Sequence, residues 1–378
     1  MSLAMESNGS SNLLGHCDEA KHKNGVLVFD SSSLQKQSEL PNEFVWSDLV
    51  DAQQDLNEPL IDLGGFMRGD AEATERAVEQ IRKACRSHGF FQVMNHGVDG
   101  KLIEAAYEEI DSVFKLSLEK KHSFRRKAAE VAGYSGAHSD RIKSQLPWKE
   151  TFTFMYEFEG DDSETSVSDY FNSVLGEDFN QTGFVYQKYC EAMKDLSMVI
   201  FELLGISLGI DRLYFRNYFQ DGNAIMRCNN YPLCNNACLT LGTGPHTDPI
   251  SLAILHQDQV GGLQVFTENK WQAIRPRPDV FVINIGDTFM ALTNGIYKSG
   301  KHRAVVNREK ERRSLVFFVC PKKDKVVRPP QDLVDREGPR RFPDFLWSDL
   351  LAFTQCEYRP DFHTLHSFVN YFLSSKFP

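Results

Sequence analysis

The chain has 378 residues, a net charge of −10 and 41% hydrophobic residues, which is an ordinary composition for a globular protein. Its acidity argues against a general nucleic-acid-binding protein, because such proteins are usually basic. No stretch approaches the roughly 18 apolar residues of a membrane span, and the eight cysteines are too scattered to complete a zinc cluster. We therefore expect a reduced, cytoplasmic, monomeric protein with neither membrane nor nucleic acid among its partners.

The first half of the sequence combines a polar tail with a mixed region. Residues 1–40 are rich in serine and asparagine, which predicts a poorly ordered tail. Residues 41–223 form the mixed α/β region, where hydrophobic periodicity separates helices from strands. The predicted elements are strands at 59–63 and 90–93 and helices at 71–88, 101–120 and 184–207.

After about residue 224 the pattern changes to short apolar or alternating runs that Gly, Pro, Asn and Asp separate. This pattern is typical of a β-sandwich or barrel and predicts a β-rich core at 224–330. A helical extension at 331–378 follows, with a last helix near 364–373. The fold class is therefore α+β. The predicted core strands are 225–231, 251–256, 262–266, 271–274, 280–285, 303–307 and 314–320.

Four His-x-Asp pairs occur in the chain. In an extended segment the residues at i and i+2 point the same way. Such a pair and one distant histidine can occupy one face of an octahedron and leave open positions, as in the two-His-one-carboxylate triad of non-haem iron(II) oxygenases. Two pairs are set aside, because one lies in the tail and the other outside the β-rich region: His16/Asp18 and His138/Asp140.

His246 and Asp248 are the preferred pair, because they follow a turn-rich segment at a loop rim, where ligands are commonly displayed. The rival pair, His256 and Asp258, lies at the far end of a predicted strand. A solvent-exposed strand end accounts for that pair. The distant histidine is His302, which precedes an apolar run and can begin a strand that faces the barrel interior.

Arg312 and Ser314 form an Arg-x-Ser motif at the start of the last predicted strand, so both side chains share one face. A guanidinium can bind a carboxylate through two hydrogen bonds, and a neighbouring hydroxyl adds a third. A charged arginine that points into an apolar barrel needs an anionic partner, which a dicarboxylate co-substrate supplies. The alternative is that Arg312 belongs to the solvated charged run at 308–313.

In order and spacing, these motifs resemble those of the plant 2-oxoglutarate/iron(II) dioxygenases. The resemblance covers about residues 40–375. The segment at 89–97, GFFQVMNHG, is similar to the N-terminal signature of the group, and the segment at 146–151, LPWKET, looks like the hallmark of gibberellin 20-oxidases. The remaining matching motifs are Asn229-x-Tyr231-Pro232, His246-x-Asp248, His302 and Arg312-x-Ser314.

The resemblance implies a distorted double-stranded β-helix, or jelly roll, with helices packed against it. It implies Fe(II) bound by His246, Asp248 and His302 as the catalytic residues, with 2-oxoglutarate as co-substrate and ascorbate as activator. The partners of the enzyme would be dioxygen and a small diterpenoid acid. Lys149 is a candidate cation for binding that acid; the alternative is that this lysine is exposed. The residues that would bind 2-oxoglutarate are Arg312, Ser314, Tyr231 and Asn229.

The implied reaction is the successive oxidation of carbon 20 of C20 gibberellin precursors, with succinate and carbon dioxide as co-products. Alternation points Lys301 away from the metal, although this lysine adds charge beside the site. It is one of several positions that depart from the family's usual residues without removing a proposed ligand. They are Asn230, Leu233, Thr247, Ala253 and Lys301, with Gly300 beside the last.

Three other interpretations stay open. The first is another member of the superfamily, such as a gibberellin oxidase acting at carbon 2 or 3 or a flavonoid oxygenase, against which the LPWKET segment argues. The second is a non-catalytic β-helix protein that binds a hormone-like ligand, against which the intact motifs argue. The third is a zinc hydrolase with the same three ligands, which would not need Arg312 and Ser314 in register.

Overall fold

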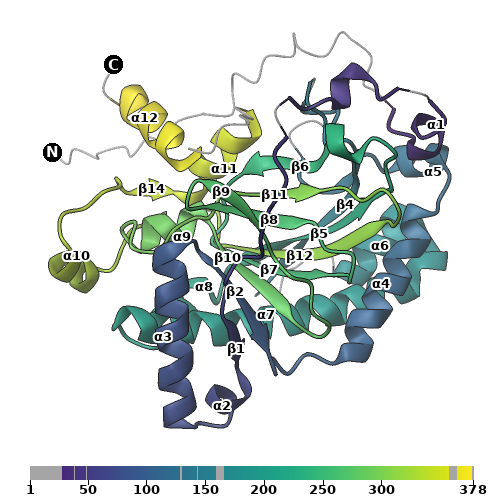
Figure 1. Ribbon diagram of the computed structural model, residues 1–378. Coiled ribbons are helices and arrows are strands. Elements are labelled where there is room, and N and C mark those ends of the chain that lie inside the picture. Colours follow the sequence, from purple (N-terminus) through teal and green to yellow (C-terminus); the bar gives the residue numbers. More distant parts are fainter. Residues whose placement is uncertain are drawn as a thin grey trace, which may run out of the picture.

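The computed structural model describes residues 28–37, 39–47, 49–127, 130–142, 144–158, 166–356 and 364–376. Two β-sheets face each other, and helices cover the outer face of the larger sheet (Figure 1). This is the predicted α+β jelly-roll architecture. The His16/Asp18 pair and the first 27 residues of the predicted tail lie outside the described residues.

The larger sheet has eight strands in the order β1-β2-β10-β7-β12-β5-β4-β3. Its β1–β2 pair is parallel, and its other neighbours are antiparallel. The sheet therefore joins strands of the mixed region to strands of the β-rich core. They are β1 (Leu60–Asp62), β2 (Phe90–Met94), β3 (Gly133–Gly136), β4 (Glu150–Glu157), β5 (Asn223–Tyr231), β7 (Leu252–Gln257), β10 (Phe281–Ile285) and β12 (Arg312–Cys320).

The smaller sheet has the order β6-β11-β8-β9 and consists of β6 (Leu241–His246), β11 (His302–Val305), β8 (Leu263–Thr267) and β9 (Lys270–Ala273). A third sheet pairs β13 (Val326–Val327) with β14 (Phe345–Leu346). All predicted strands are confirmed, with ends shifted by one or two residues. Five strands of the described chain escaped prediction. β3 and β6 are rich in Gly or Pro, β4 overlaps the LPWKET segment, and β13 and β14 have only two residues each.

The long helices follow the predicted periodicity. α3 (Ala71–Ser87) begins where the Asp70 carboxylate accepts a hydrogen bond from the Ala73 N–H, and α7 (Asn180–Leu208) crosses behind the larger sheet (Figure 1). The helix predicted at 101–120 is two helices, because Ser117 caps a new one. In the described part of the chain no helix is long and apolar enough to cross a membrane.

The remaining helices of the described chain are all shorter than α3 and α7. α12 matches the last helix predicted near 364–373. The elements not yet given are α1 (Ser31–Leu34), η3 (Asn42–Phe44), α2 (Gly64–Met67), α4 (Gly100–Phe114), α5 (Leu118–Ser123), α6 (Val167–Leu175), η4 (Glu177–Phe179), α8 (Tyr214–Phe219), η5 (Ala237–Leu239), α9 (Asp287–Leu292), α10 (Gln331–Glu337), α11 (Trp347–Cys356) and α12 (Thr364–Lys376).

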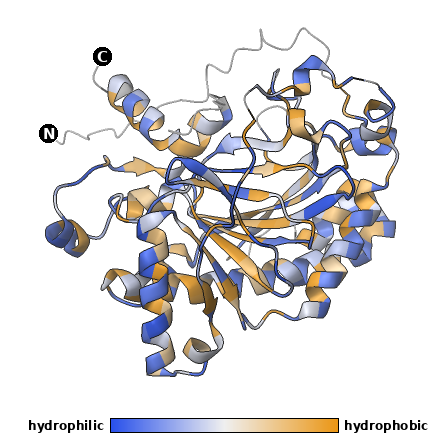
Figure 2. Ribbon diagram, viewed as in Figure 1, coloured by the Kyte–Doolittle hydropathy of each residue, from blue (hydrophilic) through white to orange (hydrophobic). Residues whose placement is uncertain are grey.

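The main hydrophobic core lies between the larger sheet and its helices. Helical side chains such as Ile81, Ile110 and Phe201 pack there against side chains of the strands, including Phe281 and Leu315. Figure 2 shows apolar residues on the strands and on the helices that cover them. A smaller cluster fills one end of the space between the two sheets, with Phe90, Val265 and Val282 among its members. Phe90 and Val282 also line a cavity at the open end of the jelly roll, so this cluster forms one border of the site described below.

A third cluster closes the rim of this open end. Phe29, which belongs to the predicted tail of residues 1–40, packs with Phe44 against the ring of Trp148 at centroid distances of 5.3 and 5.2 Å. The Trp148 indole also donates a hydrogen bond to the Pro232 carbonyl at 3.1 Å. The LPWKET segment is thereby anchored beside β5, with Lys149 directly at the cavity.

We expect Gly89→Ala to lower the free energy of unfolding by at least about 3 kcal/mol. Gly89 has φ +78°, and an added Cβ would lie 2.1 Å from the Lys298 carbonyl oxygen, so the variant suffers both backbone strain and a clash. Gly69 is the matched control, because it has the same φ and no atom within 4 Å of an added Cβ. Gly69→Ala should cost only about 1 kcal/mol in urea unfolding. Equal losses in the two variants would contradict the proposed packing of the Gly89 turn.

Candidate metal and co-substrate site

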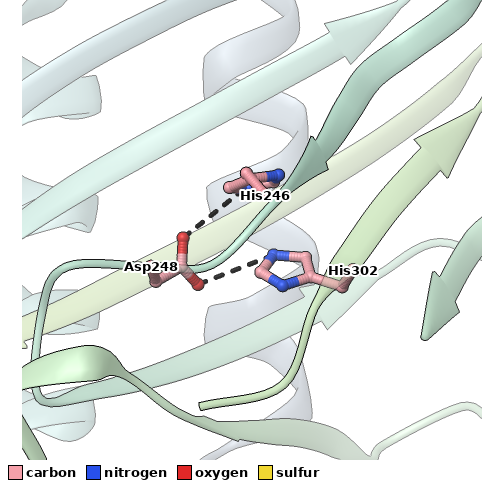
Figure 3. Close-up of side chains that lie close together, drawn as sticks. All are labelled: His246, Asp248 and His302. Atoms are coloured by element: carbon pink, nitrogen blue, oxygen red, sulfur yellow. Dashed lines mark ion pairs between the residues drawn. The ribbon is translucent and has the colours of Figure 1, made fainter. Parts of the chain in front are cut away.

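His246, Asp248 and His302 converge at the open end of the jelly roll. His246 is the last residue of β6, Asp248 follows it in the loop, and His302 begins β11, where it pairs with His246. The ligand atoms of all three lie within 4.8 Å of one another. Asp248 faces both imidazoles, with Oδ1 3.5 Å from His246 Nε2 and Oδ2 3.6 Å from His302 Nε2 (Figure 3).

Hydrogen bonds fix which nitrogen of each imidazole faces the centre. His246 Nδ1 lies 2.8 Å from the Gly244 carbonyl oxygen, and His302 Nδ1 lies 3.1 Å from that of Gly300. A carbonyl oxygen only accepts, so each Nδ1 carries the proton and donates it. In the neutral imidazoles both Nε2 lone pairs then point at the centre, which is the arrangement that metal-binding histidines adopt.

Charge also favours a cation at this place. Burial lowers the pKa of His302 to about 4, and the neighbouring His246 adds to the shift, so His302 is neutral at physiological pH. Burial alone would raise the pKa of Asp248, but His302, His246 and Arg227 together hold it below its usual range. A buried carboxylate therefore faces the Nε2 atoms of two imidazoles, a combination that one divalent cation completes.

Asn284 orients the Asp248 carboxylate through a hydrogen bond. Its Nδ2 donates to Asp248 Oδ2 at 2.7 Å from strand β10, and the Asp287 N–H donates to the Asp248 carbonyl at 2.8 Å. The sequence analysis did not select Asn284. The signal was present, because this residue is the polar one in the apolar strand FVINI and needs a buried partner.

The predicted co-substrate residues meet on two neighbouring strands. β12 and β5 pair so that Arg312 lies opposite Tyr231 and Ser314 lies opposite Asn229. Asn229 Nδ2 donates to Ser314 Oγ at 3.1 Å, and the Arg312 guanidinium lies 4.8 Å from the centroid of the Tyr231 ring. All four side chains line a cavity of about 600 Å³ that the three candidate metal ligands also line.

Arg312 has unused hydrogen-bonding capacity in this cavity. Its side chain is 1% exposed and donates from Nη2 to Gln257 Oε1 at 3.0 Å, while its buried Nε and Nη1 have no partner among the described residues. A buried guanidinium with two free donors fits one carboxylate. The alternative of a solvated Arg312 is therefore wrong. The neighbouring Arg313 is the one that points outward, where it pairs with Asp111 at 2.6 Å.

Lys149 is buried, so the alternative interpretation of Lys149 as an exposed lysine is also wrong. Its ammonium donates to Thr243 Oγ1 at 3.0 Å and lies 5.9 Å from the centroid of the Tyr231 ring. Gly242 lets that ring come close, because an added Cβ would lie 2.5 Å from Tyr231 Cδ1. Lys149 thus stands between the co-substrate pocket and a second, outer cavity, both of which it lines.

The outer cavity opens beside the candidate metal ligands. Its volume is about 1360 Å³, including the part that is open to solvent. Its wall includes Trp46, Ile225 and Phe318 together with residues of the two C-terminal helices, such as Leu351 and Phe353. Polar and charged side chains share this lining, Arg141, Gln145 and Thr354 among them, so the cavity offers both apolar walls and hydrogen-bonding groups to a small molecule.

The rival His-x-Asp pairs serve the fold. His256 is 7% exposed, which corrects the expectation of a solvent-exposed strand end. Its Nδ1 lies 3.0 Å from the hydroxyl of Tyr107, a residue too distant in sequence to be foreseen. Asp258 accepts hydrogen bonds from the backbone of Arg313 and Val260. In the pair set aside near residue 140, Asp140 binds Arg126 at 2.7 Å.

The residues that depart from the family pattern leave the candidate ligands intact. Thr247 donates to Asp287 Oδ2 at 3.1 Å, behind the metal centre. The Lys301 ammonium points away from that centre, as predicted, and lies 4.5 and 5.4 Å from the ring centroids of Phe266 and Trp271. Ala253 lines the co-substrate cavity, so its missing side-chain bulk adds space there.

Comparison with known families gives a consistent answer. A family model described as the 2OG-Fe(II) oxygenase superfamily matches residues 222–321, and one described as the N-terminal part of non-haem dioxygenases in morphine synthesis matches residues 59–176. The chain is 50% identical over 364 residues to gibberellin 20 oxidase 2 of Arabidopsis thaliana, covering 96% of this chain and 95% of that protein. It is 50% identical to gibberellin 20 oxidase 2 of Oryza sativa, over 89% of this chain and 86% of that protein.

Solved structures show the same architecture. The crystal structure of JOX2 in complex with 2OG, Fe and JA matches with a TM-score of 0.74 and 30% identity, covering 89% of this chain and 96% of that one. The rice dioxygenase for auxin oxidation matches with a TM-score of 0.64 and 28% identity, over 79% of this chain and 95% of that one.

We expect His246→Ala, Asp248→Ala and His302→Ala each to weaken Fe(II) binding by more than about 100-fold, since each removes one of three donors. Asn284→Ala should weaken it by about 10- to 100-fold, because the carboxylate loses its orienting partner. Anaerobic calorimetry checks the affinities, and Asp258→Asn is the control that should bind like the parent. Parental Fe(II) affinity in His302→Ala would contradict the ligand assignment.

His256 predicts a pH dependence of stability. Burial lowers the pKa of His256 in the folded chain to about 4, and the unfolded value is about 6.5. The unfolded state thus binds the extra proton between these values, so stability is lost as the pH falls from 6.5 towards 4. From pH 7 to pH 5 this group alone should remove about 2 kcal/mol. In urea unfolding, His256→Asn should lose correspondingly less over that range; an unchanged pH dependence would contradict the assignment.

Proposed function

The chain belongs to the gibberellin 20-oxidases of the 2-oxoglutarate/iron(II) oxygenase superfamily, and on this premise we propose which of its residues carry out the reaction. The enzyme oxidises carbon 20 of C20 gibberellin precursors in successive steps and forms succinate and carbon dioxide. We assign the iron to His246, Asp248 and His302. We assign 2-oxoglutarate to Arg312, Ser314, Tyr231 and Asn229, with Lys149 at the border of the substrate cavity.

One observation carries this assignment. A buried guanidinium with free donors lines the same cavity as a buried carboxylate and two imidazoles, so an anion and a divalent cation complete it together. A zinc hydrolase would use the three metal ligands but would leave Arg312 without a partner. A binding protein for a hormone-like ligand would need neither the triad nor the arginine.

Iron(II) bound here, with 2-oxoglutarate and dioxygen, supplies the oxidation of an unactivated C–H bond. The chain's own residues position the reactants. Arg312 and Ser314 hold the distal carboxylate of the co-substrate through charge-assisted hydrogen bonds, while Asn284 keeps the Asp248 carboxylate turned towards the centre. The apolar wall of the outer cavity holds the diterpenoid skeleton and excludes water from the reacting carbon.

We propose that the enzyme works as a cytoplasmic monomer and that ascorbate activates it by keeping the iron reduced. The identity to gibberellin 20-oxidases along nearly the whole chain supports action at carbon 20 over carbon 2 or 3.

We expect Arg312→Lys to raise the KM for 2-oxoglutarate at least about tenfold, because a lysine cannot reproduce the two-pronged contact. The KM for the gibberellin precursor should change far less. Arg313→Lys is the matched control, since the adjacent side chain faces Asp111 on the outside of the sheet. A larger effect in Arg313→Lys than in Arg312→Lys would contradict the co-substrate assignment.

A substrate panel tests the reaction. The enzyme, reconstituted anaerobically with Fe(II), receives 2-oxoglutarate, ascorbate and one of several candidates, namely a C20 gibberellin precursor, a C19 gibberellin or a flavonoid, and then air. Mass spectrometry should find oxygen at carbon 20 of the C20 precursor. Oxidation at carbon 2 or 3, or turnover of the flavonoid alone, would contradict the proposal.

A further inference from the structure

Arg227 has no role in the assignments above, although its side chain lines both the co-substrate pocket and the outer cavity. It lies on β5, on the face that also carries Asn229 and Tyr231. Among the described residues its only side-chain hydrogen bond runs from Nε to Thr153 Oγ1 at 3.4 Å, and its guanidinium lies 5.3 Å from the centroid of the Phe318 ring. Most of its donor capacity is thus free towards the cavities.

No carboxylate in the described part of the chain lies within ion-pairing distance of Arg227. Neighbouring buried arginines are engaged, since Arg126 pairs with Asp140 at 2.7 Å and Arg303 donates to Gln264 Oε1 at 2.8 Å and to the Val50 carbonyl. Asp248 acts on Arg227 only at longer range, where its charge raises the pKa of the guanidinium without an ion-pair contact. A guanidinium whose donors lack a direct acceptor favours a ligand that can accept from them. Arg312 obtains its anion from the co-substrate, which leaves Arg227 as a cation that awaits a second anion.

Two other cations line the outer cavity, Arg141 and Lys149, and Arg141 lies 3.8 Å from the Asp140 carboxylate. Burial, followed by the charge of Arg227, lowers the pKa of Lys149 well below its usual range, and its ammonium already donates to Thr243. Burial also lowers the pKa of Arg227, with Arg126 and Arg141 adding to the shift, but only to about 10. The guanidinium therefore keeps its charge at physiological pH, and its planar fork suits a carboxylate.

The residues around Arg227 indicate which carboxylate of the substrate it would bind. His246 and Asp248 line the same two cavities as Arg227, so a group bound to Arg227 lies beside the metal centre. C20 gibberellin precursors carry carboxyl groups at carbons 7 and 19. The carboxyl at carbon 19 is attached to the ring that also bears carbon 20, the carbon to be oxidised.

We propose that Arg227 binds the carbon-19 carboxylate of the gibberellin precursor and thereby presents carbon 20 to the metal centre, an inference that rests on the function proposed above. Phe318 stacks behind the guanidinium and fixes its plane. The remainder of the skeleton lies against apolar wall residues such as Ile142, Ile225 and Leu351. Arg227 is thus a specificity-determining residue, distinct from the metal ligands and from the co-substrate arginine.

A cycle of substrate and enzyme changes tests this proposal. Parent enzyme and Arg227→Gln are each given the diacid, its 19-monomethyl ester and its 7-monomethyl ester, and KM and kcat for oxidation at carbon 20 are measured. The variant should raise KM for the diacid and for the 7-ester at least about tenfold. For the 19-ester, which lacks the charge at carbon 19, parent and variant should have the same KM. Arg227→Lys, which keeps the charge but not the fork, should fall between the two for the diacid.

Several outcomes would overturn the proposal. Equal losses with all three substrates would make Arg227 a structural residue, and an accompanying rise in the KM for 2-oxoglutarate would make it a co-substrate residue. The parent enzyme alone also tests the claim, even where a variant does not fold, because the 19-ester must be a poorer substrate than the 7-ester. The proposed function fails separately, and first, if the parent does not oxidise the diacid at all.

Discussion

The antiparallel pairing of β11 with β6 sets His302 opposite His246, and the rest of the site depends on that register. Because side chains alternate along a strand, a slip of one residue would turn His302 away from the centre and bring Lys301 or Arg303 towards it. The aromatic contacts of those two cations with Trp271, on the outer side of the smaller sheet, favour the observed register. Carbonyls at Gly244 and Gly300, each two residues before its histidine, then select the metal-binding tautomer.

The larger sheet supplies the opposite wall and most of its charge. Three adjacent strands, β7, β12 and β5, place a row of polar side chains on the inner face of an otherwise apolar sheet, while the outer face packs on α7 and its neighbours. On the assignments proposed above, three charges of this interior gain a partner when the ligands bind, namely Asp248, Arg312 and Arg227. The iron would supply a counter-charge for Asp248, the co-substrate one for Arg312 and the substrate one for Arg227, so binding all three would balance these charges before chemistry begins.

Local rules were sufficient to predict much of this from the sequence. The period of two selected His246 with Asp248 and Arg312 with Ser314, because each pair depends only on one segment being extended. Residues whose role depends on long-range register were missed. Asn284 contacts Asp248 only because β10 ends beside the β6–β7 loop, and His256 is buried only because Tyr107 of α4 covers it. Arg227 carried a readable signal, since it alternates with Asn229 and Tyr231 in an apolar strand, but its lack of an acidic partner could be seen only in three dimensions.

The central claim is that one buried site couples 2-oxoglutarate to oxidation at carbon 20, and the most direct measurement is the stoichiometry of that coupling. Purified enzyme with Fe(II), 2-oxoglutarate and a C20 gibberellin precursor would be sampled over time for succinate and for each oxidised form of carbon 20. We expect one succinate for each two-electron oxidation step of the precursor, and none without iron. Consumption of the precursor without succinate, or an unchanged rate after removal of iron, would contradict the account.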